Sequence, residues 1–279
     1  MSEQVVLLIK NFFFVFAFKI EMKKILVIGV GWLGKQIVES LMNKGFTVAI
    51  SSRSKEKLNG YCENCIKISV SFNHGNCIFS EDISQYEQVI ICLPPVPAYA
   101  KIIQSILSKL SPSTRIIFTS STGIYEESAE IINENSKIKQ DHILWHAEKI
   151  IRSRSSYIIL RLGGLIGPGR HPVTHLLTKP FLEGGENAVN LIHSFDICSA
   201  ILHLLKDTKQ QSTYNLVYPI HPSKGAYYTE AAKVLAGKKL VVDYKLIEHK
   251  QVDGSKIVEE LGFDYTARID EWQTFKLNE

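Results

Sequence analysis

The sequence lacks the features that mark several classes of protein. Five cysteines in 279 residues are too few for a disulfide scaffold and favour a reducing compartment. Positive and negative charges nearly balance, since the chain has 32 Lys and Arg and 28 Asp and Glu. The resulting net charge of +4 does not indicate nucleic-acid binding. With 45% hydrophobic and 22% charged residues, the chain is not disordered or fibrous. We therefore expect a cytoplasmic globular protein without nucleic-acid or membrane partners.

No apolar run is long enough for a membrane helix. The most apolar stretch, residues 5–20, holds five of the 13 phenylalanines, but Lys10, Asn11 and Lys19 interrupt it short of the roughly 20 residues that a span needs. It also lacks a small-residue cleavage site. Because Met22 directly precedes the first predicted strand, we interpret residues 1–21 as an extension outside the fold, with a membrane or export signal as the alternative. Protein that starts at Met22 is expected to remain soluble and to bind its cofactor.

Short β-branched runs alternate with helical patterns from residue 24 onward. Runs typical of buried parallel strands occupy residues 24–29, 46–50, 89–93, 115–120 and 157–162. Helical spacing covers residues 32–44, 98–110 and about 136–153. The repetition predicts an α/β fold with a Rossmann-type, doubly wound parallel sheet in residues 22–162. Glycines and prolines loosen the pattern after that, so residues 163–279 are predicted to form a smaller substrate-binding region.

A glycine loop gives the clearest chemical signal. Residues 29–34 (GVGWLG) follow a predicted strand and open a helix, which is the context that dinucleotide binding requires. Gly29 permits the tight turn, Gly31 lets a pyrophosphate approach the backbone, and Gly34 lets the helix pack on the sheet. The helix start at Trp32 and Leu33 offers N–H groups and a dipole to the phosphates. The alternative is a glycine turn without a ligand.

The end of the second predicted strand indicates which dinucleotide is bound. An acidic side chain there would accept hydrogen bonds from the adenosine ribose hydroxyls of NAD, but residues 51–55 (SSRSK) contain none. The Ser52 hydroxyl and the Arg53 guanidinium are instead donors suited to a ribose 2′-phosphate. The sequence therefore predicts NADP, with a merely solvated Arg53 as the alternative.

Four later motifs resemble the extended short-chain dehydrogenase/reductase family. They occur in the family's order, at residues 118–125 (FTSSTGIY), 160–170 (LRLGGLIGPGR), 190–196 (NLIHSFD) and 253–263 (DGSKIVEELGF). Within the family, these motifs and the glycine loop are most similar to the YeeZ-like branch. The members of that branch are described only as NAD(P)-binding, epimerase- or dehydratase-like proteins.

The resemblance implies roles for residues at strand ends, where ligands bind in parallel sheets. Ser121 would polarise the substrate, and the substitute proton donors considered are Tyr125, His193 and His171. Arg170 and His171 would face the substrate. The nicotinamide half of the site would be lined by Leu93, Pro94, Ser120, Leu162 and Gly163.

The acid–base pair of this family is missing. No Tyr-x-x-x-Lys occurs between residues 126 and 156. Aligning the family's glutamate with Glu148 puts Gln140 at the tyrosine position and Leu144 at the lysine position. On a continuous helix these two share the apolar face, whereas His142 and His146 face solvent. Because an amide cannot transfer the proton, we expect NADPH binding but little turnover of simple ketones, aldehydes and alcohols.

Two functions remain open at this point. The first is an NADP-dependent epimerase, dehydratase or reductase that acts, as a monomer or homodimer, on a hydroxylated, sugar-like small molecule. The second is a catalytically silent protein that senses NADPH or recruits a partner. No metal is expected, since a zinc set of Cys62, Cys65, His74 and Cys77 fits no common finger spacing.

Overall fold

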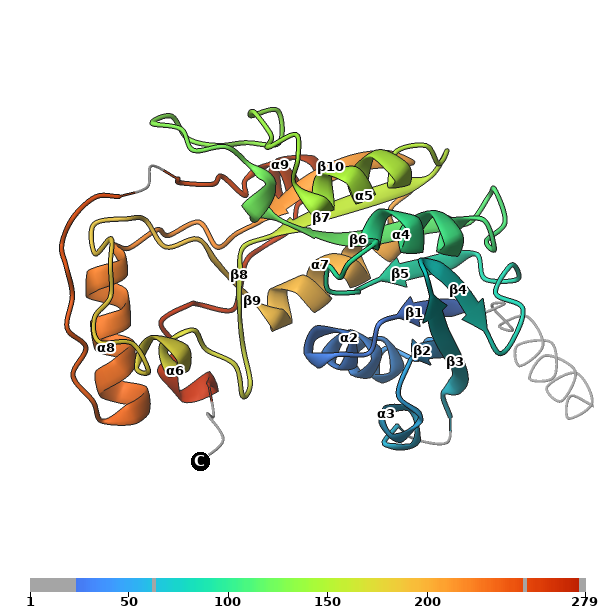
Figure 1. Ribbon diagram of the computed structural model, residues 1–279, viewed down its shortest axis with the longest axis horizontal. Coiled ribbons are helices and arrows are strands. Elements are labelled where there is room, and N and C mark those ends of the chain that lie inside the picture. The colour runs from blue at the N-terminus through green and yellow to red at the C-terminus, as the bar shows by residue number, and fades with distance from the viewer. Residues whose placement is uncertain (1–23, 62–63, 248–249, 276–279) are drawn as a thin grey trace, which may run out of the picture.

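An eight-stranded sheet forms the centre of the computed structural model (Figure 1). The structure describes residues 24–61, 64–247 and 250–275, so the predicted extension (residues 1–21) and Cys62 lie outside the described residues. The strand order is β10-β7-β6-β5-β1-β2-β3-β4. All neighbouring strands pair in parallel except β3 and β4, which are antiparallel. The predicted doubly wound parallel sheet is confirmed.

The strands that follow the predicted runs are β1 (Ile25–Ile28), β2 (Val48–Ser52), β5 (Gln88–Ile91), β6 (Arg115–Ser121) and β7 (Tyr157–Leu162). The sheet also contains β3 (Ile66–Asn73), β4 (Asn76–Phe79) and β10 (Gln211–Leu216), which lie outside those runs. The chain order runs from β1 outward to β4 and then returns to β5 on the other side of β1. Open parallel sheets bind ligands at such a reversal, beyond the carboxyl ends of the strands.

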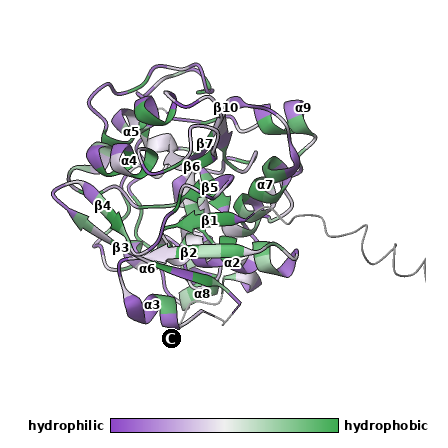
Figure 2. Ribbon diagram, turned by 90° about the vertical axis from the view of Figure 1, so that its right-hand side faces the viewer, coloured by the Kyte–Doolittle hydropathy of each residue, from purple (hydrophilic) through white to green (hydrophobic). Residues whose placement is uncertain are grey.

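Helices cover both faces of the sheet. Helices α2 (Trp32–Asn43) and α7 (Ser194–Lys206) pack together on one face, and α4 (Tyr99–Leu107) and α5 (Ile143–Ile151) on the other; the short α3 (Lys55–Asn59) follows β2. Leu26 and Ile28 of β1 join the α4/α5 core, whereas Ile25 and Val27 join the α2/α7 core. Figure 2 shows the hydrophobic strands at the centre. Because both faces are covered, β1 is apolar at every position.

A smaller part lies beside the sheet and has its own core. It contains the parallel pair β8 (Gly164–Ile166) and β9 (Leu191–His193), helices α6 (Val173–Leu176) and α8 (Lys224–Ala236), and the 3₁₀ turn η2 (Trp272–Thr274). The chain returns to the large sheet in α7 and β10, and α9 (Lys256–Leu261) contacts β10. Within the described ranges, no helix combines the length and apolar character needed to cross a membrane.

Helix α5 begins later than the sequence pattern predicts. The predicted start near residue 136 is wrong, since the helix begins at Ile143. Ile138 forms an antiparallel bridge with Tyr125, and the Lys139 N–H donates to the Ile124 carbonyl, so this segment cannot adopt helical hydrogen bonding. His142 becomes the N-cap residue, and its Nδ1 accepts a hydrogen bond from the Leu144 N–H at 3.2 Å. Gln140 therefore lies before the helix and does not share a helical face with Leu144, contrary to the prediction.

Candidate functional site

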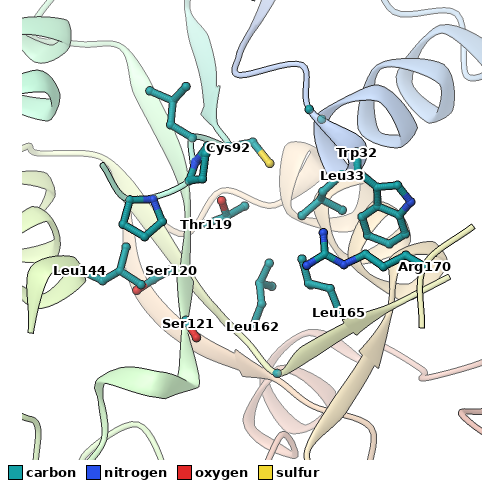
Figure 3. Close-up of a pocket in the computed structure, with 16 residues that line it drawn as sticks. Trp32, Leu33, Cys92, Thr119, Ser120, Ser121, Leu144, Leu162, Leu165 and Arg170 are labelled. Carbon is teal, nitrogen blue, oxygen red and sulfur yellow. The ribbon is translucent and has the colours of Figure 1, made fainter. Parts of the chain in front are cut away.

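Two adjoining cavities lie at the carboxyl ends of the central strands. The first, about 470 Å³, is bordered by the glycine loop and by the ends of β5, β6 and β7 (Figure 3). The second, about 340 Å³, is bordered by the ends of β1 and β2, and it shares Gly31, Leu93 and Pro94 with the first. The residues predicted to bind the cofactor all line one or both cavities. They are Gly29, Gly31, Trp32, Leu33, Gly34, Ser52, Arg53, Leu93, Pro94, Ser120, Leu162 and Gly163.

The three loop glycines differ in what a side chain would meet. Gly29 has a φ of +99°, and a Cβ there would lie 2.7 Å from the Cys92 carbonyl oxygen. A Cβ on Gly34 would lie 2.1 Å from the Gly29 carbonyl oxygen. A Cβ on Gly31 would have no atom within 4 Å. Gly29 and Gly34 are therefore required by the fold, whereas Gly31 leaves space for a ligand at the start of α2.

The second cavity has donors and no carboxylate among the described residues that line it. The Ser51 hydroxyl is completely buried and has no hydrogen-bond partner, a state that costs about 1–3 kcal/mol unless a ligand supplies the partner. The guanidinium of Arg53 lies 5.3 Å from the centroid of the Phe72 ring. Ser52 and Lys57 also border this cavity, which is therefore suited to an anionic group.

A loop from the smaller part closes one side of the first cavity. The Trp32 indole donates to the Pro168 carbonyl oxygen at 2.9 Å, and the Arg170 guanidinium lies 5.0 Å from the Trp32 ring centroid. Figure 3 shows Trp32 and Arg170 on the side opposite Leu144. Arg170 is exposed and forms no ion pair within the described ranges, so its charge is available to a ligand.

The predicted proton donors do not come together in this cavity. Ser121 lines it, but Tyr125 is buried elsewhere, where its hydroxyl donates to Asn215 Oδ1 at 2.7 Å and accepts from Arg161 Nη1 at 2.7 Å. Burial raises the pKa of Tyr125 to about 12. His193 caps α7 through Nδ1 and lines a separate cavity between α2 and α7. Neither Tyr125 nor His193 is therefore placed to contact a substrate that lies beside Ser121.

His171 also lies away from the cavity, inside the core of the smaller part. Its Nδ1 accepts from the Val173 N–H, so Nε2 carries the proton and donates to the Tyr227 hydroxyl at 3.0 Å. The rings of Tyr227, Trp272 and Phe275 surround it. The structure therefore uses this histidine as a buried hydrogen-bonding group, whereas the sequence predicts a substrate contact.

Acid is expected to destabilise the protein through His171. Burial lowers its pKa to about 4 from the ordinary value of 6.5. A lowered histidine pKa gives stability that is complete above pH 6.5 and is lost as the pH falls through 4, on the order of 3 kcal/mol in all. Urea unfolding at pH 7 and pH 4.5 measures this loss, and His171→Gln should show a much flatter pH dependence. Equal slopes for both proteins would contradict the assignment.

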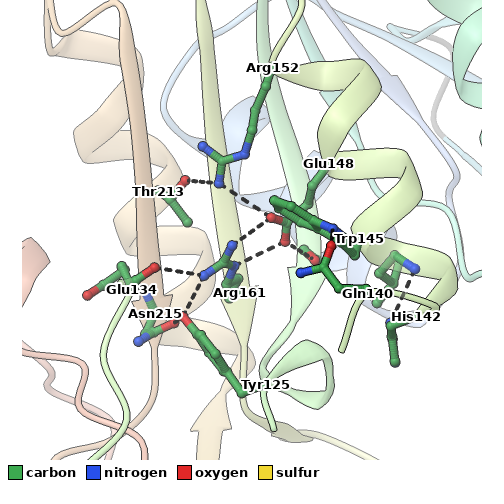
Figure 4. Close-up of polar contacts among 12 residues, drawn as sticks. Tyr125, Glu134, Gln140, His142, Trp145, Glu148, Arg152, Arg161, Thr213 and Asn215 are labelled. Carbon is green, nitrogen blue, oxygen red and sulfur yellow. Dashed lines mark hydrogen bonds and ion pairs between the residues drawn. The ribbon is translucent and has the colours of Figure 1, made fainter. Parts of the chain in front are cut away.

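A buried ion pair fixes the strand end that carries Ser121 (Figure 4). Arg161 Nε and Nη2 donate to the two oxygens of Glu148 at 3.1 and 2.8 Å, and both side chains are essentially inaccessible. The Ser120 hydroxyl donates to the same carboxylate at 2.7 Å, so its proton is already engaged although Ser120 lines the first cavity. This cluster ties α5 to β6 and β7 immediately beside the cavity.

The sequence pattern did not identify His142 as a candidate site residue. A continuous helix would direct it to solvent, but the N-cap position makes it half-buried. A Cβ built on Gly123 would lie 3.3 Å from Ser121 Oγ and 3.8 Å from His142 Nε2. A polar residue directly before an apolar helical run is a recognisable start signal, and it would have placed His142 at the helix end rather than on its outer face.

Comparison with known sequences matches this chain to a family model for an NAD-binding domain and to Protein YeeZ. The family model for the NAD-binding domain of 6-phosphogluconate dehydrogenase matches residues 24–144. The chain is 30% identical to Protein YeeZ of Escherichia coli (strain K12) over 266 residues, which cover 88% of this chain and 96% of that protein. Protein YeeZ of Escherichia coli O157:H7 matches to the same extent.

Solved structures with this fold include proteins that bind NAD. UDP-glucuronic acid 4-epimerase from Bacillus cereus, in complex with NAD, aligns with a TM-score of 0.71 and 17% identity, over 91% of this chain and 95% of that chain. dTDP-glucose 4,6-dehydratase from Bacillus anthracis, also with NAD, gives 0.71 and 15% over 90% and 94%. MoeE5 in complex with UDP-glucose and NAD gives 0.69 and 16% over 90% and 96%. At these identities the likeness shows the fold.

Proposed function

Since the chain belongs to the same family as Protein YeeZ and has the fold of NAD-bound epimerases and dehydratases, we propose that it is an NADP-dependent enzyme of the extended short-chain dehydrogenase/reductase family, of the epimerase, dehydratase or reductase type. One observation carries the proposal: the strand ends and the glycine loop form two adjoining cavities, and every residue that the sequence singles out for a dinucleotide lines them. Cavities of this size at the switch point of a parallel sheet are where such folds bind ligands.

The second cavity favours NADP over NAD. Arg53 and Ser52 would bind the ribose 2′-phosphate, and the unpartnered Ser51 hydroxyl would find a partner in the adenosine ribose. No described carboxylate lines this cavity to repel the added phosphate. The open space at Gly31 and the N–H groups at the start of α2 would receive the pyrophosphate.

The first cavity would receive the nicotinamide and the substrate. When bound, the nicotinamide supplies hydride chemistry. Ser121 donates a hydrogen bond from the end of β6, and Arg170 supplies a positive charge from the opposite part of the lining. A hydroxylated small molecule with an anionic group suits this pair, and a nucleotide sugar of the kind bound to MoeE5 is the first candidate.

Arg53→Ala is expected to weaken NADPH binding by about 10- to 100-fold, because a charge-assisted hydrogen bond contributes about 1.5–3 kcal/mol. NADH binding should change much less, since NADH has no 2′-phosphate. Fluorescence titration of both cofactors measures the ratio of dissociation constants. Lys55→Ala is the matched control, because it removes the same charge two residues away without lining the cavity. Equal losses for NADPH and NADH would refute the proposed role of Arg53.

Turnover distinguishes the enzyme from a silent NADPH sensor. Nucleotide sugars and other hydroxylated anions should be assayed for NADPH oxidation, for NADP⁺ reduction and, by chromatography, for epimerisation without net redox change. A product from any of these substrates supports the enzyme. NADPH binding without a product in any assay favours the sensor.

A further inference from the structure

We propose that Ser121 and His142 form a two-donor site that binds the reacting oxygen of the substrate. The inference rests on the proposed function, because Ser121 lines the cavity assigned there to the nicotinamide and the substrate. In this site His142 takes the place of the family's missing tyrosine, whose aligned position is occupied by Gln140. The Gln140 side chain is engaged elsewhere, since its Oε1 accepts from the Trp145 indole at 3.1 Å.

Ser121 presents a free hydroxyl proton. Its Oγ accepts a hydrogen bond from the Gly123 N–H at 3.0 Å, which orients the side chain at the start of η1 (Thr122–Ile124). No described protein group accepts the Ser121 hydroxyl proton. Because Ser121 lines the first cavity, this donor is available to a substrate oxygen.

His142 presents a second donor through its tautomer. Its Nδ1 accepts from the Leu144 N–H (Figure 4), so in the neutral ring the proton is on Nε2. Burial, followed by the charge of Lys139, lowers the pKa of His142, although Asp141 opposes the shift. The ring is therefore neutral at pH 7 and offers an Nε2–H with no partner among the described residues.

Gly123 lies beside both donor atoms. The Cβ position of Gly123 is 3.3 Å from Ser121 Oγ and 3.8 Å from His142 Nε2, so the absence of a side chain leaves room between them. Two fixed donors around one oxygen stabilise the negative charge that develops on it. A neutral imidazole N–H is sufficient to polarise a carbonyl group in this way.

Sulfite with NADP⁺ tests the pair before the natural substrate is identified. The sulfite sulfur donates its electron pair to C4 of the nicotinamide, which forms a C–S bond and places sulfonate oxygens beside that carbon. The equilibrium constant of the adduct is read from its near-ultraviolet absorbance. We expect the full-length protein to stabilise the adduct by about 10- to 100-fold over free NADP⁺, and Ser121→Ala to remove about tenfold of this.

Two substitutions separate the Nε2 donor of His142 from its capping role. His142→Asn keeps an N-cap acceptor, but its side chain is too short to replace Nε2; it should lose about tenfold in adduct stability and retain its urea midpoint. His142→Gln carries an amide nitrogen near the former Nε2 position; it should keep most of the adduct stability and unfold at lower urea concentration. His146→Gln, on the exposed outer side of α5, is the matched control and should change neither quantity.

The results distinguish this inference from the proposed function. If NADP⁺ binds with a measurable affinity but the protein does not stabilise the adduct, or if His142→Asn stabilises it as well as the unmodified protein does, the two-donor site is refuted alone. Loss of adduct stability in His142→Gln but not in His142→Asn would assign His142 to capping only. Failure of the unmodified protein to bind NADP⁺ would refute the proposed function itself.

Discussion

Arg161→Met is expected to lower the free energy of unfolding by about 3 kcal/mol, because it leaves the buried Glu148 carboxylate with only one cationic partner, Arg152, at the longer distance of 3.4 Å. The Glu148 carboxylate would lose two hydrogen bonds, at 3.1 and 2.8 Å, in a place without solvent. The Tyr125 hydroxyl and the Glu134 carbonyl would each lose a donor as well. Urea unfolding followed by circular dichroism measures the change, which is a large fraction of the stability of a typical domain.

An exposed ion pair provides the matched control. Arg268 contacts Asp270 at 2.8 Å, but about half of each side chain is exposed, so Arg268→Met should cost less than about 1 kcal/mol. The double variant Glu148→Leu, Arg161→Met removes both buried charges and should recover part of the loss. If Arg161→Met and Arg268→Met had similar effects, the buried cluster would not be the support of the β6 end that we infer.

Gly31→Val is expected to weaken NADPH binding by more than about 100-fold while leaving stability nearly unchanged. The side chain meets no protein atom within 4 Å of its Cβ, and the φ of −79° at this position suits any residue. It would instead occupy the space proposed for the pyrophosphate. Loss of two charge-assisted hydrogen bonds, at about 1.5–3 kcal/mol each, exceeds a hundredfold in affinity.

Gly34→Ala is the complementary variant. Its Cβ would lie 2.1 Å from the Gly29 carbonyl oxygen, so the helix must move from the strand and thermal stability should fall. Calorimetry of both variants, with NADPH titration of each, gives the two quantities. Retained NADPH affinity in Gly31→Val would show that the dinucleotide does not pass this glycine.

Local patterns in the sequence predicted much of the sheet and of the cofactor cavities. Apolar runs that are buried on both faces, such as residues 157–162, leave little choice of structure, and β7 has the same bounds. The conformations of the glycine loop and the strand ends depend on residues that are close in sequence, so many of the residues that line the two cavities were also predicted. The antiparallel pair β3 and β4 and the late strand β10 have weaker patterns, and they are not among the five predicted runs.

The side chains that donate protons could not be placed from local patterns, because distant contacts determine their surroundings. Tyr125 is held by Arg161 and Asn215, which are 36 and 90 residues away. His171 is buried through Tyr227, 56 residues away. The position of His142 depends on the bridge between Tyr125 and Ile138, which delays the start of the helix to Ile143. A shift of about seven residues in a helix start, or a long-range contact, thus changes the role of a histidine.

Calorimetric titration of the full-length protein with NADPH and with NADH measures whether the two cavities hold a dinucleotide and which one they prefer. We predict saturable binding of one dinucleotide per chain, with NADPH tighter than NADH by about tenfold or more, since the 2′-phosphate gains a charge-assisted hydrogen bond from Arg53. Binding of neither dinucleotide, or tighter binding of NADH, would contradict it.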